Sequence, residues 1–209
     1  RPGTDRMIAD IAAALGMRIE HEEQCRSYRK RSNELTATDL IWRGRFHLKR
    51  LTRSDSAKAA QLFAEALERD PASVEARIQL LWLKVRDLWL NRGSLEDIRQ
   101  ARSDAQAVIQ TDNAEARGYM LAGITELWLG HVVRAERLLT QAIAINPGLA
   151  MAHAQLGGVY YFQGRRDRSL ATLETARRLS PNDHDLFFIH GQMAMAHLLA
   201  DKYTAAIDY

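Results

Sequence analysis

The sequence has a single cysteine, Cys25, and only 4 prolines among its 209 residues. One cysteine excludes a disulfide within the chain, which fits a reducing compartment, and we therefore expect a cytoplasmic protein. No apolar run approaches the roughly 20 residues of a membrane-spanning helix. No apolar segment with a small-residue cleavage site follows Arg1, as a signal peptide would require. Because an initiator methionine is missing, we expect this chain to be a piece of a longer protein.

The composition is typical of an ordered helical protein. Apolar residues make up 46% of the chain and charged residues 26%, and runs of Val, Ile and Thr are rare. This balance favours helices over strands and excludes a disordered chain. Residues 1–53 hold 12 Lys and Arg against 7 Asp and Glu, whereas residues 54–209 hold 17 against 19. The positive charge therefore lies near the start of the chain.

Residues 26–32, RSYRKRS, form the one concentrated basic run. The simplest interpretation is a solvated connector in front of a helix. A patch that binds nucleic acid or acidic lipid is the alternative, since clustered Lys and Arg attract phosphate groups. No nucleic-acid-binding motif accompanies the run, which favours the connector.

Two successive blocks of the chain repeat one pattern with a period of 34 residues. Residues 114–147 read AEARGYMLAGITELWLGHVVRAERLLTQAIAINP, and residues 148–181 read GLAMAHAQLGGVYYFQGRRDRSLATLETARRLSP. At this offset the aligned pairs are Gly123 with Gly157, Gly130 with Gly164, Ala135 with Ser169, Leu139 with Leu173, Ala142 with Ala176 and Pro147 with Pro181. A fixed period of this length indicates a repeat architecture.

Each block predicts two helices. Gly130 and Gly164 are expected to end the first helices, because glycine commonly follows the last helical residue. The second helix carries small or apolar residues at i, i+4 and i+7, and a proline stops it. Small residues such as Gly123 and Gly157 would let the two antiparallel helices approach closely.

Two earlier blocks show the same pattern with different lengths. In residues 37–71 the first helix has Gly44 as its small contact residue, and the turn TRSDS is expected to be about three residues longer than its counterparts. In residues 72–113 the first helix is predicted to be about two turns too long and to end at Gly93. Ser94 and Asp97 are then expected to form a capping box.

Residues 182–209 begin another unit, in which Gly191 would be the small contact residue. The chain ends inside its predicted second helix, so we expect the array to continue beyond Tyr209 or to have been truncated there.

These residues resemble the tetratricopeptide repeat (TPR), a helix-turn-helix unit of 34 residues. Its characteristic positions are filled by Gly157, Ser169, Leu173, Ala176 and Pro181 in one block and by Gly123, Ala135, Leu139, Ala142 and Pro147 in the other. The resemblance implies an all-α fold, a right-handed superhelix of antiparallel helix pairs. Residues 1–36 would be an N-terminal helix and a basic connector, and residues 37–209 a TPR array with units 37–71, 72–113, 114–147, 148–181 and 182–209.

A narrower resemblance concerns residues 37–71, ATDLIWRGRFHLKRLTRSDSAKAAQLFAEALERDP. Through the core Ile41-Trp42-Arg43-Gly44-Arg45 it looks like the first repeat of TPR regions in bacterial signalling proteins. Those proteins carry a class III adenylate or guanylate cyclase domain, or a winged-helix DNA-binding domain, before the repeats. A TolB-like segment often precedes the repeats there and ends in a helix like residues 5–23.

This resemblance implies a non-catalytic interaction and regulatory module of a signalling protein, namely an adenylate or guanylate cyclase in cAMP signalling. The alternatives are the effector module of a winged-helix transcriptional regulator and a stand-alone scaffold or assembly protein. A helical enzyme or a direct nucleic-acid binder forms a third class.

No catalytic, metal or cofactor motif is evident. Gly118 and Gly123 have the glycine spacing of a phosphate-binding loop, but Ile124 stands where its lysine would be. His190 and His197 are seven residues apart without a carboxylate or cysteine at metal-ligand spacing. We therefore expect no enzyme activity, cofactor or metal in this chain.

In TPR domains the first helices line the inner face, where peptides bind. Carrying those positions across predicts a groove lined by Arg117, Met120, Ile124, Leu127, Met151, Ala154, Gln155, Gly158 and Tyr161. The set is mostly apolar, and it lacks the Lys and Asn clamp that some TPR domains use for a C-terminal carboxylate. We expect an apolar or helical protein or peptide partner, intramolecular or intermolecular, with a homodimer as one option.

Four tryptophans, Trp42, Trp82, Trp89 and Trp128, all fall on predicted first helices. Packing between helices is the simpler interpretation of them, and stacking on a ligand is the alternative. Trp82 and Trp89 are seven residues apart and would cover a neighbouring segment such as residues 5–20.

Overall fold

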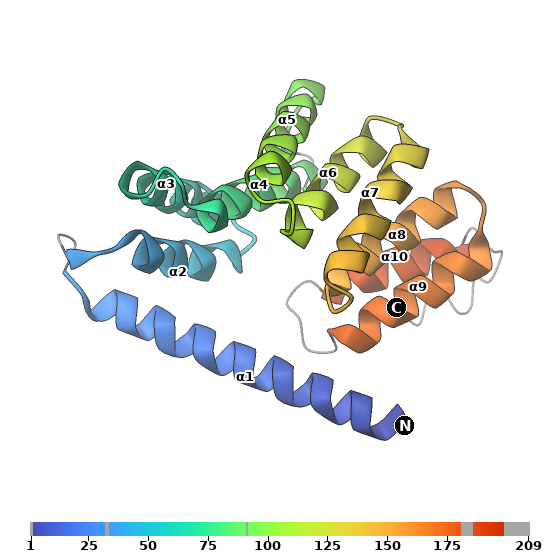
Figure 1. Cartoon of the computed structure of the whole chain (residues 1–209), viewed down its shortest axis with the longest axis horizontal. Coiled ribbons are helices and arrows are strands. Elements are labelled where there is room, and N and C mark those ends of the chain that lie inside the picture. Colours follow the sequence, from blue (N-terminus) through green and yellow to red (C-terminus); the bar gives the residue numbers. More distant parts are fainter. Residues whose placement is uncertain (1, 32–33, 91, 181–185, 199–209) are drawn as a thin grey trace. The chain divides into compact units, whose positions relative to one another are not determined.

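The structure, a computed structural model, describes residues 2–31, 34–90, 92–180 and 186–198 (Figure 1). Within these ranges all regular structure is helical, which confirms the all-α prediction. The helices are α1 (Pro2–Arg29), α2 (Ala37–Leu48), α3 (Arg53–Arg69), α4 (Val74–Trp89), α5 (Leu95–Thr111), α6 (Ala116–Trp128), α7 (Val132–Ile145), α8 (Ala150–Phe162), α9 (Arg166–Leu179) and α10 (Leu186–Leu198). None of these described helices is long and apolar enough to cross a membrane.

From α2 onward the helices pack as consecutive pairs. Helix α2 pairs with α3, α4 with α5, α6 with α7 and α8 with α9, and the second helix of a pair also packs against the next first helix, as α3 does against α4 and α7 against α8. A single pair cannot bury its apolar side alone, and this stacking supplies the shared core.

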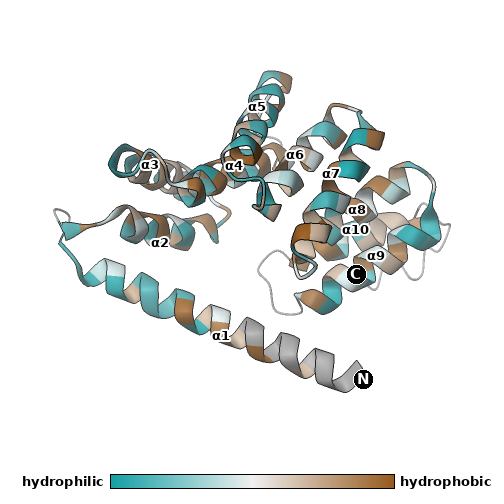
Figure 2. Ribbon diagram, in the orientation of Figure 1, coloured by the Kyte–Doolittle hydropathy of each residue, from teal (hydrophilic) through white to brown (hydrophobic). Residues whose placement is uncertain are grey.

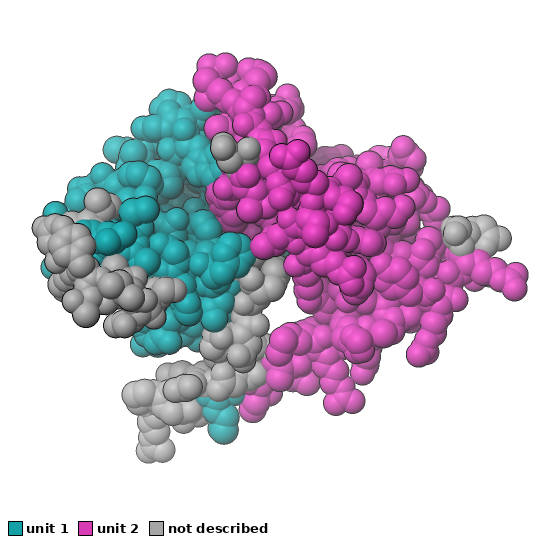
Figure 3. Space-filling model, turned by 180° about the vertical axis from the view of Figure 1, so that it is seen from behind, with its two compact units in different colours: residues 1–10, 113–209 teal, residues 11–112 magenta. Residues whose placement is uncertain are grey.

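The chain divides into two compact units. One comprises residues 11–112, and the other comprises residues 113–209 with residues 1–10 (Figure 3). The boundary falls between the predicted blocks 72–113 and 114–147, to within one residue. The finer division into residues 1–36 and five repeat units stays a prediction.

In residues 11–112 hydroxyl side chains begin the helices. Thr36, Thr52, Ser73 and Ser94 are the N-caps of α2 to α5, and each accepts a hydrogen bond from a backbone N–H in the first turn. The predicted capping box is confirmed: Asp97 N–H donates to Ser94 Oγ at 3.3 Å, and Ser94 N–H donates to Asp97 Oδ2 at 2.7 Å.

Glycine ends α6 and α8, the first helices of blocks 114–147 and 148–181, as predicted. Gly130 and Gly164 have φ of 82° and 72°, the left-handed region that favours glycine. Gly130 N–H donates to Leu127 O at 3.0 Å and His131 N–H to Glu126 O at 2.9 Å. This pair of bonds is a Schellman motif, which satisfies carbonyls that the helix itself leaves unpaired.

The lengths of the irregular blocks differ from the prediction. Helix α4 has 16 residues against 13 in α6 and α8, so it is under one turn longer and not two turns. It ends at Trp89 and not near Gly93, because Arg92 N–H turns back to Asp87 O at 2.9 Å. Helix α5 takes a further three residues, with 17 against 14 in α7.

The turn in residues 37–71 is also shorter than expected. Most of TRSDS belongs to α3, because Thr52 caps that helix by accepting from Asp55 N–H at 3.1 Å. The extra residues therefore lengthen the start of a helix and not the turn.

Glycines at the eighth position of the first helices allow the close approach that the sequence predicts. A Cβ on Gly123 would lie 2.7 Å from Leu139 Cγ, and one on Gly157 would lie 2.6 Å from Leu173 Cγ. A Cβ on Gly44 would clash with the ring of Phe63. The second helix expected to pack on Gly191 falls in residues 199–209, outside the described residues.

Candidate functional site

The predicted groove residues all lie on α6 and α8, the first helices of two successive pairs. Helix α8 contacts both α6 and α10, so the first helices of residues 113–209 lie side by side. The second and twelfth residues of each helix are half-buried. They are Arg117 and Leu127 in α6, and Met151 and Tyr161 in α8. The fifth and ninth residues, Met120, Ile124, Ala154 and Gly158, are buried, and so is Gln155.

This burial changes what the middle of the predicted groove can do. Met120 is 4% exposed and Ile124 is not exposed at all. Ala154 belongs to an apolar cluster with Leu173 and Ile189. A Cβ on Gly158 would lie 3.0 Å from Oε1 of Gln192 on α10, so this glycine lies at the contact between α8 and α10. These residues support the packing of the helices, and their predicted role as peptide contacts stays a prediction.

Arg117, at the start of α6, is bound by its neighbour Glu115. Its Nε donates to Glu115 Oε1 at 2.9 Å, and its Nη2 donates to Oε2 at 2.7 Å. The hydrogen bond from Arg117 is the main cause of the lowered pKa of Glu115. The guanidinium charge is therefore balanced locally, and it gives an acidic partner little to bind.

The other ends of α6 and α8 carry a set of accessible apolar and aromatic side chains. Leu127 and Trp128 close α6, and Tyr161 and Phe162 occupy the equivalent positions of α8. We call these four residues the C-terminal ledge. The rings of Tyr161 and Phe162 stack with centroids 4.2 Å apart, and Phe162 is 60% exposed. Burial raises the pKa of Tyr161, so its hydroxyl stays protonated and can donate a hydrogen bond.

The sequence analysis did not predict two features of this region, the exposed ring of Phe162 and a buried carboxylate. Phe162 lies outside the apolar spacing of α8, and only the run Tyr160-Tyr161-Phe162 signalled it. Glu126 is 1% exposed and holds the turn after α6: its Oε2 lies 2.6 Å from His131 Nδ1, and its Oε1 lies 3.2 Å from Arg134 Nε. No sequence pattern pointed to this cluster.

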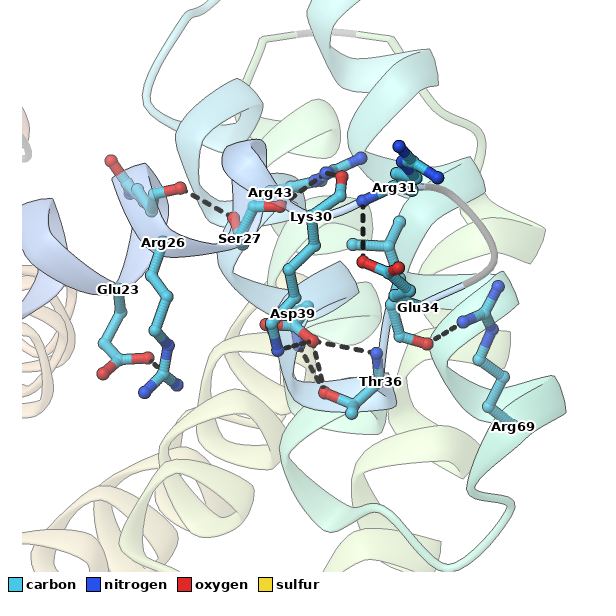
Figure 4. A network of polar contacts seen from close by, with 12 residues as sticks. Glu23, Arg26, Ser27, Lys30, Arg31, Glu34, Thr36, Asp39, Arg43 and Arg69 are labelled. Atoms are coloured by element: carbon cyan, nitrogen blue, oxygen red, sulfur yellow. Dashed lines mark hydrogen bonds and ion pairs between the residues drawn. The ribbon is translucent and has the colours of Figure 1, made fainter.

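Residues 26–31 of the basic run form part of a polar joint between α1 and α2 (Figure 4). Lys30 Nζ donates to both carboxylate oxygens of Asp39, at 2.9 and 2.7 Å, and Arg43 Nη2 donates to the carbonyls of Ser27 and Lys30. Arg26 pairs with Glu23. Two of the four cations of the run are thus in ion pairs within the chain, which favours the connector interpretation over a nucleic-acid patch.

Asp39 is the centre of this joint. Burial by itself would raise the pKa of its carboxyl, but hydrogen bonds from Lys30 and from the backbone and side chain of Thr36 outweigh burial and lower the pKa to about 2. Further along α1, Glu20 Oε2 accepts from Lys49 Nζ at 2.7 Å. Figure 2 shows how hydrophilic the C-terminal part of α1 is, as such a joint requires.

The four tryptophans are half-buried on first helices, in agreement with a packing role. Trp82 and Trp89 contact each other edge to face with centroids 5.2 Å apart, and Arg45 lies over the ring of Trp42 at 4.7 Å. Contact of Trp82 and Trp89 with residues 5–20 stays a prediction. Among the described residues, no group of three or more His, Cys, Asp and Glu could hold a metal ion.

This geometry defines a class of protein, the helical repeat proteins. Its helices pack in close pairs, and α6 and α8 end at a glycine. Residues 127–187 match the family model described as the tetratricopeptide repeat. No match was found among curated proteins.

Solved structures give the same fold. The chain is similar to TTC0263, a thermophilic TPR protein of Thermus thermophilus, with TM-score 0.66 and 22% identity over 83% of this chain and 87% of that chain. It is similar to the APC/C hetero-tetramer Cut9-Hcn1, with TM-score 0.68 and 17% identity over 90% of this chain and 35% of that chain. It is also similar to pilF of Pseudomonas aeruginosa, with TM-score 0.58 and 19% identity over 83% of this chain and 72% of that chain. The fold is that of a TPR solenoid.

Proposed function

We propose that this chain is a non-catalytic protein-interaction module that binds a protein or peptide at the C-terminal ledge of residues 113–209. The observation that carries the proposal is the stacked pair of Tyr161 and Phe162, a half-buried ring that supports one that is 60% exposed. Aromatic side chains with fixed geometry supply much of the binding energy at protein interfaces. The ledge narrows the groove that the sequence predicts to one end of α6 and α8.

The partner should be apolar or helical and not an acidic tail. Leu127, Trp128 and Phe162 offer apolar surface, and the nearest predicted cation, Arg117, is already paired with Glu115. The partner segment can belong to the same chain or to another one, and a second copy is one option.

Substitutions at the ledge test this proposal once a partner is in hand. Phe162→Ala should weaken binding about tenfold or more, because an exposed ring contributes to an interface without supporting the core. Ile143→Ala, a half-buried apolar position near the C-terminal end of α7 and outside the four residues of the ledge, is the control. Met120→Ala is a poor test, since that side chain is 4% exposed and its loss should destabilise the fold. Unchanged affinity in Phe162→Ala and Tyr161→Ala would exclude the ledge.

We further propose that the module belongs to a cytoplasmic bacterial signalling protein with an adenylate or guanylate cyclase domain. The resemblance of residues 37–71 supports this parent. The alternatives are a winged-helix regulator and a stand-alone scaffold. The match to TTC0263 supports the stand-alone scaffold, because this chain covers 87% of that chain. Sequencing the gene upstream of Arg1 decides among them: a cyclase domain is expected, whereas a winged-helix domain or a signal peptide would replace the first proposal.

A further inference from the structure

Helices α3 and α4 enclose an open cavity of about 450 Å³ in residues 11–112. Its floor is apolar, with Ala57 and Ala60 from α3 and Leu80 and Leu83 from α4. This volume is at the lower end of the range for ligand pockets and suits one or two side chains of a bound segment. The cavity belongs to a different unit from the ledge.

The residue at the eleventh position of α4 lines the cavity. Lys84 stands there, whereas the equivalent position of α8 is Tyr160. The ammonium group of Lys84 pairs with Asp104 Oδ2 on α5 at 2.6 Å. Lys84 is exposed and tied to another helix, and the residues that line the cavity from α3 include two small side chains, Ala57 and Ala60.

The rim of the cavity is positively charged. Among the described residues that line it, three are cations, Arg53, Lys84 and Arg92, and one is a carboxylate, Asp87. Asp87 accepts from Ser56 Oγ at 3.3 Å and lies 3.5 Å from Arg92 Nη1, so it pairs with Arg92 as Asp104 pairs with Lys84. Arg53 is exposed in the first turn of α3, where the helix dipole adds to its positive potential.

We propose that this cavity binds a protein segment in which an apolar side chain is flanked by carboxylates. The apolar side chain enters between Ala57 and Leu80, and a carboxylate meets Arg53. Charge complementarity selects this occupant. Lys84 and Arg92 are in ion pairs, so Arg53 is the rim cation that remains to meet a carboxylate, and it would repel a segment flanked by cations. This binding is independent of the ledge and adds a second class of partner sequence to the proposed function.

A peptide titration with the full chain tests the proposal. The probe is a fluorescein-labelled peptide of about 12 residues in which pairs of Leu alternate with pairs of Glu, enough for about three helical turns. Its two counterparts carry Lys in place of Glu and Ser in place of Leu. Fluorescence anisotropy should show the Leu/Glu peptide binding at least about tenfold tighter than either counterpart.

Two substitutions then locate the binding. Ala57→Trp fills the cavity from an exposed position, and Arg53→Glu reverses the rim charge; each should weaken binding about tenfold. The matched controls are Ala144→Trp, at an exposed alanine of α7, and Arg166→Glu, at the exposed first residue of α9. Both controls should bind within about twofold of the unchanged chain.

Three results would overturn the proposal: equal binding of the three peptides, unchanged affinity in Ala57→Trp and Arg53→Glu, or loss of binding in Phe162→Ala alone. The last result would place the peptide on the ledge, which separates failure of this proposal from failure of the proposed function. Because Arg53 is exposed, Arg53→Glu stays informative even where Ala57→Trp lowers stability.

Discussion

Helices α2 to α5 in residues 11–112 begin at Thr or Ser side chains that cap them, whereas α7, α8 and α9 in residues 113–209 begin at His131, Leu149 and Arg165 without a side-chain cap bond. Before α7 and α9 the left-handed glycines Gly130 and Gly164 instead fix the ends of α6 and α8, whereas α6 begins at Glu115, whose side chain accepts from Arg117 N–H. A cap at a helix start and one at a helix end satisfy comparable numbers of backbone groups. The turns within the pairs are therefore fixed from opposite sides in the two units: at the start of α3 and α5, but at the end of α6 and α8.

The contact between paired helices shows a second difference. Two positions can be compared in every pair: the eighth residue of the first helix, and the residue six before the end of the second helix. They are Gly44 and Phe63 in α2–α3, Leu81 and Ala105 in α4–α5, Gly123 and Leu139 in α6–α7, and Gly157 and Leu173 in α8–α9. In α4–α5 the large residue lies on the first helix and the small one on the second, the reverse of the other pairs. All four positions of Leu81, Ala105, Leu139 and Leu173 are buried. From this register we expect Leu81 to pack against Ala105, with the large residue supplied by the first helix of the pair.

The largest effect is expected from Leu81→Ala. The substitution would put two alanines at the reversed contact and leave a cavity, which lowers the free energy of unfolding by about 3 kcal/mol. Urea denaturation of this variant and of Leu95→Ala, where the leucine is 53% exposed, makes the comparison. A loss of similar size at both positions would contradict the buried role of Leu81.

Gly157→Leu tests the same contact from the other unit. The added side chain would meet Leu173 and should destabilise the chain by about 2 kcal/mol through overpacking. Adding Leu173→Ala recreates the arrangement of Leu81 and Ala105 and should restore most of that loss. A double-mutant cycle by denaturation gives the coupling, and additive effects of the two substitutions would show that the volumes do not compensate each other.

Acid should act on residues 11–112 through Asp39. Its folded pKa, about 2, lies below the ordinary 3.8, so the unfolded chain takes up the proton first. The stabilisation is complete above pH 3.8 and is lost as pH falls toward 2, with a total of about 2 kcal/mol. Other carboxyls also titrate in this range, so the measurement is the difference in unfolding free energy between the unchanged chain and Asp39→Asn at pH 5 and pH 2. The difference should shrink at pH 2, and a constant difference would contradict the lowered pKa.

The smallest effects concern the caps that distinguish the two units. Gly164→Ala places a Cβ at φ of 72° and should cost about 1 kcal/mol. Ser94→Ala removes the bond to Asp97 N–H and should cost about the same. Ser94→Gly should lower the free energy of unfolding by only a few tenths of a kcal/mol, because glycine is tolerated at an N-cap. Thermal unfolding of the three variants checks this order, which a larger loss in Ser94→Gly than in Ser94→Ala would contradict.

The sequence predicted the features that depend on local chemistry. The contact glycines Gly44, Gly123 and Gly157, the stops at Gly130 and Gly164 and the box of Ser94 and Asp97 each need a particular residue at one position. The structure confirms these features. The predicted turn length in residues 37–71 and the predicted length of the first helix in residues 72–113 were wrong. The helix was predicted too long because apolar periodicity continues through Leu90, although backbone bonds end α4 at Trp89.

The candidate site was harder to predict. Register placed the groove positions on α6 and α8, but it could not show which of them are buried. That depends on how α8 packs against α6 and α10, contacts between residues far apart in the chain. Phe162 and the cluster around Glu126 follow from the same packing, and no local spacing signals them.

Photo-crosslinking at Phe162 tests the central claim, that the C-terminal ledge binds a protein. Benzoylphenylalanine replaces Phe162 in one variant and Val133, which is 80% exposed on α7, in the control. After irradiation in the producing cells, mass spectrometry should find one discrete protein or peptide adduct at position 162 and none at position 133, and Tyr161→Ala should remove it. An absent adduct at position 162, or equal yields at the two positions, would contradict the account.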